Sequence, residues 1–380
     1  MKQFIQQSIG IDISKASFSA CVCQRDLSGD ELLSDVAEFR NNKTGFNQLV
    51  KWSKKFTQPS PEPIYLMEAT GSYYENLAHH LYDLKQPVSV LLPNKVNHYA
   101  KSLNVKTKTD SVDARVIAKL GVERKLSLWQ PPSPVLKYLR DLTRQCSDLK
   151  KERTVFINRL KAIKSGFDPQ PFIIKSNKDI IKELTKQIDK CETEIKNHIH
   201  SEEWLRSKVE KILTIKGVGI ITVAIILAET QGFEFVQNIR QLTSYAGLDV
   251  VRRESGTSVM GKTRISKKGN SRIRSALFLP ALISSLRNED LKRKYHRIIE
   301  DKSSKMIGIT ALQRRILILI YTLWRKDETY IENFCDQSEC EQNTQAKPEE
   351  KDTHGKKAGR SYNLPAQDEL QLDKSKLSLV

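Results

Sequence analysis

The sequence predicts three parts: a mixed α/β domain at the N-terminus, a helical coiled-coil hairpin in the middle, and a mainly α C-terminal domain. β-rich runs alternate with helical periods up to about residue 128, and apolar residues then recur three and four apart from 129 to 204. Helical patterns dominate residues 205–335. Residues 336–380 have few apolar side chains and no period, which predicts a disordered tail. With 380 residues the chain is long enough for two or three domains.

The N-terminal domain is expected to span residues 1–128. Its first two β-rich runs, Ser8–Ile13 and Phe18–Gln24, are joined tightly enough to form a hairpin. In order, the predicted elements are strands at 8–13, 18–24 and 36–40, a helix at 44–56, a strand at 63–68, a helix at 73–84, a strand at 88–92 and a helix at 110–120. Strands and helices in this order predict a mixed sheet with helices on its faces.

The middle segment is expected to form an antiparallel pair of helices. A proline-rich linker follows Trp129, and a heptad-like pattern runs from Leu139 to Ile163. After a break rich in Pro and Gly the pattern resumes from Ile181 to His198. The hairpin either packs on itself or assembles the chain into a homo-oligomer, because two helices alone bury little apolar surface.

The composition favours a polyanion as partner. Lys and Arg number 63 against 45 Asp and Glu, a formal net charge of +18. The apolar run from Ile316 to Trp324 is too short to span a bilayer, and the N-terminus lacks the apolar core of a secretory signal. The six cysteines form no CxxC pair and have no His at zinc-ligand spacing, which fits a reducing cytoplasm.

Four carboxylates stand where they could share a cation. Asp12 and Glu68 each end or interrupt an apolar, strand-like run, and Asp110 and Asp113 are spaced to share one face of a helix. Carboxylates gathered from distant parts of a chain repel one another unless a cation joins them, and oxygen ligands favour Mg²⁺ or Mn²⁺. The simpler alternative is that Asp12 and Glu68 form salt bridges, Asp110 is a helix N-cap and Asp113 is a first-turn charge.

Two segments of the C-terminal domain are candidate phosphate contacts. Lys216, Gly217 and Gly219 form a glycine turn before an apolar helix, which is typical of a helix-hairpin-helix element, although a plain turn would look the same. The second segment has eight basic residues and one acid, which is too lopsided for a salt-bridged surface. Its basic residues are Arg252, Arg253, Lys262, Arg264, Lys267, Lys268, Arg272 and Arg274.

Ser255 lies within this basic segment, beside Gly256. Surrounding cations would lower the cost of an attacking alkoxide and of a pentavalent phosphate. From the residues alone, an ordinary loop serine is the simpler interpretation. Ser258 competes for the same role, and no histidine lies nearby in the sequence to act as a base.

The motifs together resemble the IS110 family of insertion-sequence transposases, relatives of the Piv/MooV DNA invertases. The resemblance rests on GIDISK at residues 10–15, MEATGSYYENLA at 67–78 and KTDSVDARVIA at 108–118. It continues in the segment from Leu213 and in the basic segment around Ser255, and covers about half the chain. Any one of these motifs alone would be weak, whereas their order and company are specific.

This resemblance implies a RuvC-like, ribonuclease H-like N-terminal domain of the DEDD class, with Asp12, Glu68, Asp110 and Asp113 as metal ligands. It also implies that Ser255 is a nucleophile that joins DNA. Further implied are double-stranded DNA as substrate, an element-encoded guide RNA, a homo-oligomer (dimer or tetramer), and a nucleoid-associated place in a bacterial or archaeal cytoplasm.

Two other functions remain open from the sequence. A RuvC-like junction endonuclease would use metal-activated water and no covalent intermediate, so that Ser255 would be structural. A non-enzymatic DNA-binding protein would use the four acids only as caps and salt bridges.

Overall fold

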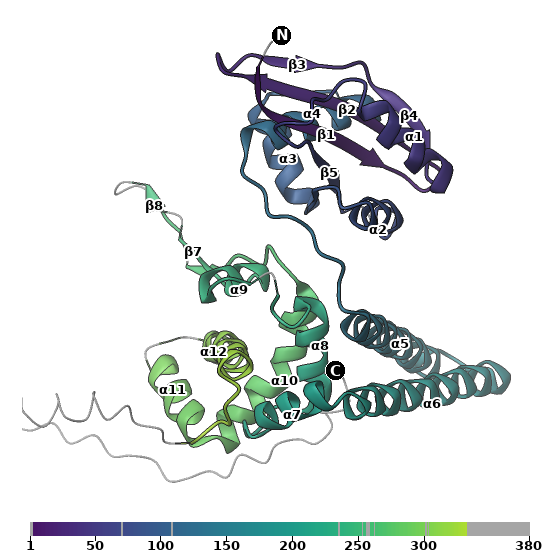
Figure 1. The fold of residues 1–380 in the computed structure, drawn as a ribbon. Coiled ribbons are helices and arrows are strands. Elements are labelled where there is room, and N and C mark those ends of the chain that lie inside the picture. Colours follow the sequence, from purple (N-terminus) through teal and green to yellow (C-terminus); the bar gives the residue numbers. More distant parts are fainter. Residues whose placement is uncertain are drawn as a thin grey trace, which may run out of the picture. The chain divides into compact units, whose positions relative to one another are not determined.

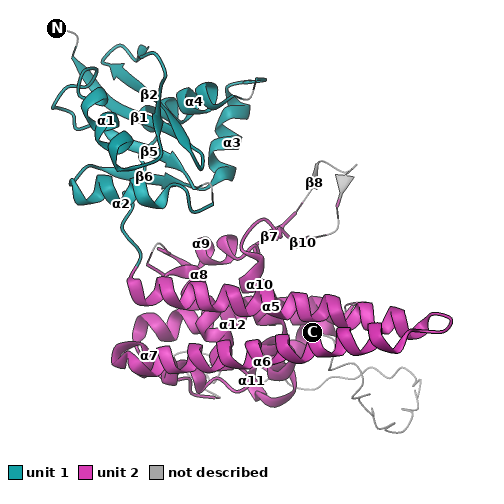
Figure 2. Cartoon of the chain, turned by 90° about the vertical axis from the view of Figure 1, so that its right-hand side faces the viewer, with its two compact units in different colours: residues 1–132 teal, residues 133–380 magenta. Residues whose placement is uncertain are grey.

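The computed structural model describes residues 3–69, 71–107, 109–234, 236–252, 254–255, 259–261, 263–300, 302 and 304–332. For residues 254, 255, 259 and 260 only the backbone is described. The chain divides into two compact units, residues 1–132 and 133–380 (Figures 1 and 2).

A mixed sheet forms the centre of the first unit. Its strand order is β3-β2-β1-β5-β6, with β4 also paired to β2 (β1 to β5 are labelled in Figure 1 and β6 in Figure 2). Strand β2 is antiparallel to β1, whereas β5 is parallel to both β1 and β6. The bounds are β1 Phe4–Ile13, β2 Ser17–Asp26, β3 Glu31–Leu33, β4 Ala37–Arg40, β5 Ile64–Glu68 and β6 Val88–Leu91. The prediction of a mixed α/β fold with a mixed sheet is confirmed, and β3 is a strand that the sequence analysis did not predict.

Helices cover both faces of this sheet. Helices α1 (Lys43–Ser53) and α2 (Glu75–Asp83) pack on the face that carries Ile9, Ile11 and Ile13. Helices α3 (Pro93–Ser102) and α4 (Asp110–Glu123) lie on the other face, and their apolar residues gather around Leu66. Because side chains alternate along a strand, consecutive residues of β1 serve opposite layers. Helix α3 was not predicted.

Trp129 packs the end of the first unit against β6 and α2. Its backbone N–H donates to the carbonyl of Val88 at 2.7 Å, and its ring meets the rings of His79 and Tyr82 edge-on at 5.1 and 6.1 Å. Helix α5 begins at Pro134, so residues 130–133 form the whole connection between anchored parts of the two units.

The second unit is built from helices around one apolar core. The long helices α5 (Pro134–Ser165) and α6 (Pro171–Ser201) form an antiparallel arm (Figure 2). The remaining helices are α7 Glu203–Leu213, α8 Ile220–Thr230, α9 Ile239–Tyr245, α10 Ser271–Arg287, α11 Glu289–Ile299 and α12 Lys305–Lys326. Short strand pairs, β7 (Val250–Val251) with β10 (Arg264–Ile265) and β8 (Glu254–Ser255) with β9 (Val259–Met260), lie between α9 and α10.

The base of the arm belongs to that core. Leu139 and Cys146 of α5 and Ile195 of α6 are buried in the same cluster as the apolar residues of α8, α10 and α12. Toward the tip the two helices pack on each other, and Phe167 and Phe172 are exposed. The structure thus groups the hairpin with the C-terminal helices, whereas the sequence analysis gave residues 129–204 a domain of their own.

Helix α12 is longer than the apolar run recognised in the sequence. Its 22 residues are apolar enough to cross a bilayer by length and composition. However, Leu312, Ile316, Leu317 and Ile320 are buried in the core of the unit, which accounts for that composition without a membrane.

Candidate active site

Asp12 and Glu68 lie on neighbouring parallel strands at the same edge of the sheet. The β1–β5 register pairs Gly10 with Leu66 and Ile11 with Met67, so Asp12 and Glu68 occupy the next position. Strand alternation places Asp12 on the face of Gly10, and Glu68 on the face of Leu66. Both side chains are half-buried. Two acids from segments far apart in the sequence are therefore side by side in the backbone.

Helix α4 runs antiparallel to β1 on this face, in unusually close contact with it. The Ser8 hydroxyl donates to the carbonyl of Ala118, and a Cβ added at Gly121 would lie 2.5 Å from Ser8 Cβ. Two residues along β1, a Cβ added at Gly10 would lie 2.6 Å from Ala118 Cα and closer still to the carbonyl oxygen of Ala114. Moving forward along β1 thus means moving backward along α4. This progression brings Asp12 alongside the first turn of α4.

That first turn carries Asp110 and Asp113. Thr109 is the N-cap, because its hydroxyl accepts from the N–H of Val112 at 3.3 Å. The alternative that Asp110 is the N-cap is therefore wrong: Asp110 is the first residue of the helix and is exposed, whereas Asp113 is half-buried. Acids are favoured in the first turn of any helix, so the positions of Asp110 and Asp113 are consistent with a structural role as well as with a catalytic one.

The fold therefore collects the four predicted acids at one edge of the sheet, but their side chains do not form a metal site. Among the residues that the structure describes, no three His, Cys, Asp or Glu side chains are grouped so that they could hold a metal ion. Asp12, Glu68 and Asp113 each interact with other groups of the protein. Carboxylates suit a hard divalent cation, so the donor set fits one, whereas the present side-chain arrangement would have to change.

The basic segment of the second unit forms a loop on a short paired stem. Strands β7 and β10 pair through Val251 with Arg264, and farther out β8 and β9 pair through Ser255 with Val259. The backbone of Ser255 thus lies in a strand, and its side chain is outside the description. Ser258, Arg253 and Lys262, which the sequence analysis also named, lie outside the described residues.

The remaining bases of this segment fall into two groups. Arg252, Arg264, Lys267 and Lys268 are exposed. Arg274, by contrast, donates to the carbonyls of Ala246 and Gly269 at 2.8 and 3.1 Å. Arg272 lies 3.6 Å from Asp148 and 3.9 Å from Glu229. Of the eight bases predicted to contact phosphate, Arg272 and Arg274 are thus engaged by protein acceptors, while the four exposed bases are available to a polyanion.

The glycine turn packs on α10 and opens on its other side. Gly217 has φ of +98°, and a Cβ there would lie 2.5 Å from the hydroxyl of Ser284. That hydroxyl donates to the carbonyl of Lys216 at 2.9 Å, and the Lys216 ammonium pairs with Glu332. Gly219 is the N-cap of α8, and a Cβ there would meet no atom within 4 Å. The helix-hairpin-helix interpretation stays a prediction.

Glu229 is a functional candidate that the sequence analysis missed. Its side chain is 3% exposed, and it accepts from Arg144 Nε at 2.8 Å, from Arg144 Nη2 at 3.0 Å and from Asn270 Nδ2 at 2.7 Å. Burial works to raise the pKa of Glu229, but hydrogen bonds from Arg144 and Asn270 and the charges of Arg144 and Arg272 outweigh it and hold the pKa below the usual value. A single acid near the end of an apolar helix was the available signal, because a buried charge needs partners.

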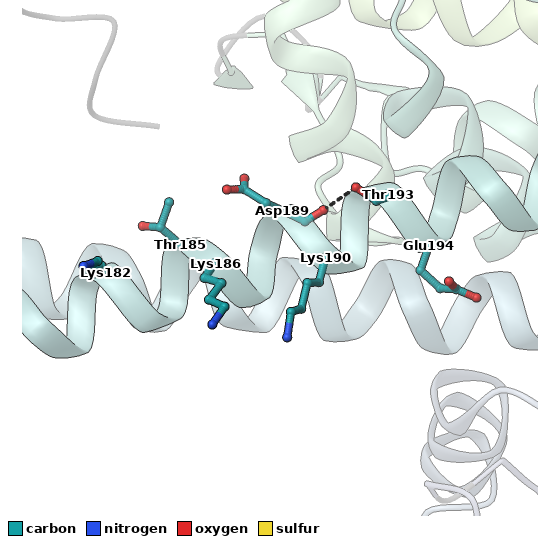
Figure 3. A pocket seen from close by; sticks show the side chains of 7 residues that line it. All are labelled: Lys182, Thr185, Lys186, Asp189, Lys190, Thr193 and Glu194. Carbon is teal, nitrogen blue, oxygen red and sulfur yellow. Dashed lines mark hydrogen bonds between the residues drawn. The ribbon is translucent and has the colours of Figure 1, made fainter.

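A separate surface hollow of about 710 Å³ lies on α6 (Figure 3). It is lined from one helix only, and Thr193 within it donates to the carbonyl of Asp189 in the preceding turn. Lys182, Lys186 and Lys190 recur every fourth residue along it. No groups converge from different elements here, and we assign no role to it.

Comparison with known proteins identifies the family. The family model described as "Transposase", for the DEDD transposases of IS110 type, matches residues 9–167. A second model, "Transposase IS116/IS110/IS902 family", matches residues 209–297. Together the two matches cover more than half of the chain, and they include all four acids and the basic segment with Ser255.

Similar proteins extend over most of the sequence. A pilin gene-inverting protein of Moraxella bovis is 29% identical over 323 residues, covering 85% of this chain and 97% of its own. The transposase for insertion sequence element IS1111A of Coxiella burnetii is 24% identical and covers 70% of this chain and 78% of its own. A solved structure of the Ppx/GppA protein family from Aquifex aeolicus covers 85% of this chain and 92% of its own at 9% identity, but its TM-score of 0.19 carries no argument about the fold. On the family matches and these relatives, the chain belongs to the IS110 family of transposases.

Proposed function

We propose that this protein cuts double-stranded DNA and joins it to a second strand through a phosphoserine intermediate on Ser255. Family membership makes it a DNA transposase or recombinase, an enzyme of strand cleavage and transfer. The observation that supports a catalytic site most directly is the convergence of Asp12, Glu68 and the first turn of α4 at one sheet edge. We also propose that the first unit is RuvC-like, which its mixed sheet and this edge of acids support.

Asp12, Glu68, Asp110 and Asp113 are the residues that would hold Mg²⁺ or Mn²⁺. When bound, the cation would polarise a phosphate and stabilise the charge of the transition state. Without it, four acids at one edge would repel both each other and the DNA backbone. The proposal therefore requires the carboxylates of the α4 turn and the strand ends to turn toward one another when cation and DNA arrive.

The joining chemistry belongs to Ser255. Its hydroxyl oxygen attacks phosphorus and forms a seryl phosphodiester, while the bond from phosphorus to one deoxyribose oxygen breaks. That oxygen leaves with a proton, and the serine proton passes to solvent. A hydroxyl of the second strand then attacks the same phosphorus and releases the serine, so the number of phosphodiester bonds is conserved and no high-energy cofactor is needed.

The exposed bases of the loop are proposed phosphate contacts. Arg252, Arg264, Lys267 and Lys268 would neutralise the backbone on either side of the reacting phosphate. The counterions released from the DNA would favour binding and make the affinity salt-dependent. Arg272 and Arg274 are better explained as parts of the protein scaffold.

Assembly and RNA guidance complete the proposal. Because the acids lie in the first unit and Ser255 in the second, a homo-oligomer could combine sites from different copies. Exposed apolar residues near the tip of the arm, among them Phe167 and Phe172, support contact with a second copy. A guide RNA encoded by the element is compatible with the basic surface, and the cytoplasm around the nucleoid would supply both nucleic acids.

Trapping of a protein–DNA adduct tests the proposal. Purified protein is incubated with labelled DNA that carries the element ends, and with Mg²⁺, then denatured and run on a gel. We expect an adduct that Ser255→Ala abolishes and Ser258→Ala leaves in place, and that EDTA prevents. DNA cleavage without any adduct would indicate a junction endonuclease instead, and DNA binding without cleavage would indicate a non-enzymatic protein.

A further inference from the structure

A buried carboxylate joins the arm to the loop that carries Ser255. Glu229, near the C-terminal end of α8, receives the paired hydrogen bonds of Arg144 from the arm helix α5. It also accepts from Asn270, the residue just before α10. Arg272 adds a longer ionic contact to the same carboxylate, and also reaches Asp148 of α5. Three elements therefore meet on one charged group that is almost shielded from water.

Asn270 belongs to the root of the loop. Its backbone N–H donates to the carbonyl of Tyr245 at 2.7 Å, and its side-chain oxygen caps α10 by accepting from Arg272 and Ile273. The hydroxyl of Tyr245 donates in turn to the backbone carbonyl of Glu229 at 2.9 Å. Asn270 and Tyr245 thus both bond to Glu229, and the hydrogen bond between them joins the two ends of the loop.

The stem rises directly from this root. Lys267 N–H donates to the carbonyl of Gly247 at 3.1 Å, and Ser266 N–H donates to that of Asp249 at 2.9 Å. Gly269 approaches so closely that a Cβ there would collide with the carbonyl of Tyr245 and the N–H of Gly247. Strands β7 and β10 continue the pairing outward. Among the described residues of the stem, Val250 is exposed and Ile265 is half-buried against the core of the unit. The polar contacts at the root therefore act together with the packing of Ile265 in fixing the direction of the stem.

We infer that Glu229 is a positioning residue, which fixes the direction of the Ser255 loop relative to the arm. The expected effect on adduct formation rests on the proposed function, whereas the expected effect on the rigidity of the loop root does not. The shared carboxylate makes the loop root and the arm base one rigid joint. Loss of its charge would leave Arg144 without its paired carboxylate and Arg272 with Asp148 alone, and the root of the loop would lose its common anchor.

The joint also links the arm helix α5 to the loop. Helix α5 carries Arg144, which pairs with Glu229, and Asp148, which pairs with Arg272. The two α5 residues lie one turn apart on the same face of the helix. Any partner that binds the arm therefore contacts a helix that is hydrogen-bonded, through Glu229, to the root of the loop. A change at the arm can therefore reach the root of the Ser255 loop through Arg144, Glu229 and Asn270, within a single unit.

The test compares Glu229→Gln with Glu203→Gln in the full-length protein. Glu203 is a matched control, because it also pairs with an arginine, Arg206, but its side chain is 76% exposed. Amide hydrogen exchange is measured by mass spectrometry in peptides that cover residues 244–252 and 263–272, the arm tip and the first unit. In parallel, adduct formation is measured at saturating DNA together with the Kd for DNA.

Glu229→Gln is expected to speed exchange at the loop root by roughly tenfold or more, because a unit that opens locally shows faster exchange there and not elsewhere. Adduct formation should slow by a similar factor with the Kd for DNA nearly unchanged, and Glu203→Gln should resemble the wild type. In a double variant with Arg144→Gln the effect should not grow, because both changes break the same joint.

Unchanged exchange at the root, or an equal rise throughout the second unit, would overturn the inference. If Glu229→Gln fails to fold, Arg144→Lys keeps the charge but loses the paired geometry, and the same peptides decide. If the wild type forms no adduct that depends on Ser255, the proposed function fails. The exchange measurement then still shows whether Glu229 holds the loop.

Discussion

Replacing Gly10 by alanine should push α4 away from the sheet and damage the candidate active site. The added methyl group would lie 2.6 Å from Ala118 Cα and closer to backbone atoms of Ala114 and Ala118, none of which can rotate away. The nearest of these atoms, Ala118 N, would lie at 2.1 Å, so the helix would have to retreat by more than about 1 Å to restore ordinary contact. Overpacking of this kind costs about 3 kcal/mol, the upper part of the usual range. The same retreat would move Asp110 and Asp113 away from Asp12.

Hydrogen exchange of β1 and α4 peptides in the full-length protein measures this cost. A loss of about 3 kcal/mol corresponds to roughly hundredfold faster exchange in the first unit. Gly166→Ala is the control, because a Cβ there would lie 3.3 Å from a single carbonyl oxygen at an ordinary φ of −75°, and it should leave exchange nearly unchanged. DNA cleavage by Gly10→Ala should fall as well. If Gly10→Ala exchanges like the wild type and cleaves DNA at the wild-type rate, then the close contact of α4 does not hold the acids in register.

The remaining predictions concern the acids, the buried carboxylate and the arm. Asp12→Asn should lower DNA cleavage by roughly hundredfold or more at an unchanged melting temperature, since one donated ligand or charge at a reacting phosphate is worth that much; normal cleavage would exclude Asp12 from the site. Because the pKa of Glu229 is lowered, its contribution to stability should be complete above the ordinary value of 4.5 and be lost as the pH falls through the lower folded value. Acid unfolding of the second unit should therefore be shallower in Glu229→Gln, and identical curves would contradict the role of this charge. Phe167→Ser combined with Phe172→Ser should shift sedimentation toward smaller species if the arm tip joins two copies, and unchanged sedimentation would remove the arm tip from the interface.

The sequence predicted the first unit well where burial leaves a periodic signature. Strands β2, β5 and β6 appear within two residues of their expected bounds, whereas β1 begins at Phe4, four residues before the expected start at Ser8. Helix α3 escaped prediction because only Val96 and Tyr99 of its ten residues are buried, so its polar surface hides the helical period. Pro93 at its first turn was the one local signal.

The acids illustrate a different limit. Local sequence placed Asp12 and Glu68 at strand ends, but their adjacency follows from the parallel β1–β5 register, which links residues more than fifty positions apart. The position of Asp110 depended on whether Thr109 or Asp110 capped the helix, and both residue types are good caps. The arm shows the same limit, because its heptads could not reveal that Leu139 and Ile195 pack into the core of the C-terminal helices.

The short connection after Trp129 works as a tether of defined length. Four residues can span at most about 14 Å, and Pro131 and Pro132 stiffen them. Such a tether keeps the effective concentration of one unit around the other high whichever orientation they take. Flexible Gly-Ser insertions would lower this effective concentration as roughly the −3/2 power of linker length. Cleavage should fall with linker length if the acids and the serine that act together belong to one polypeptide, and should not fall if they belong to two.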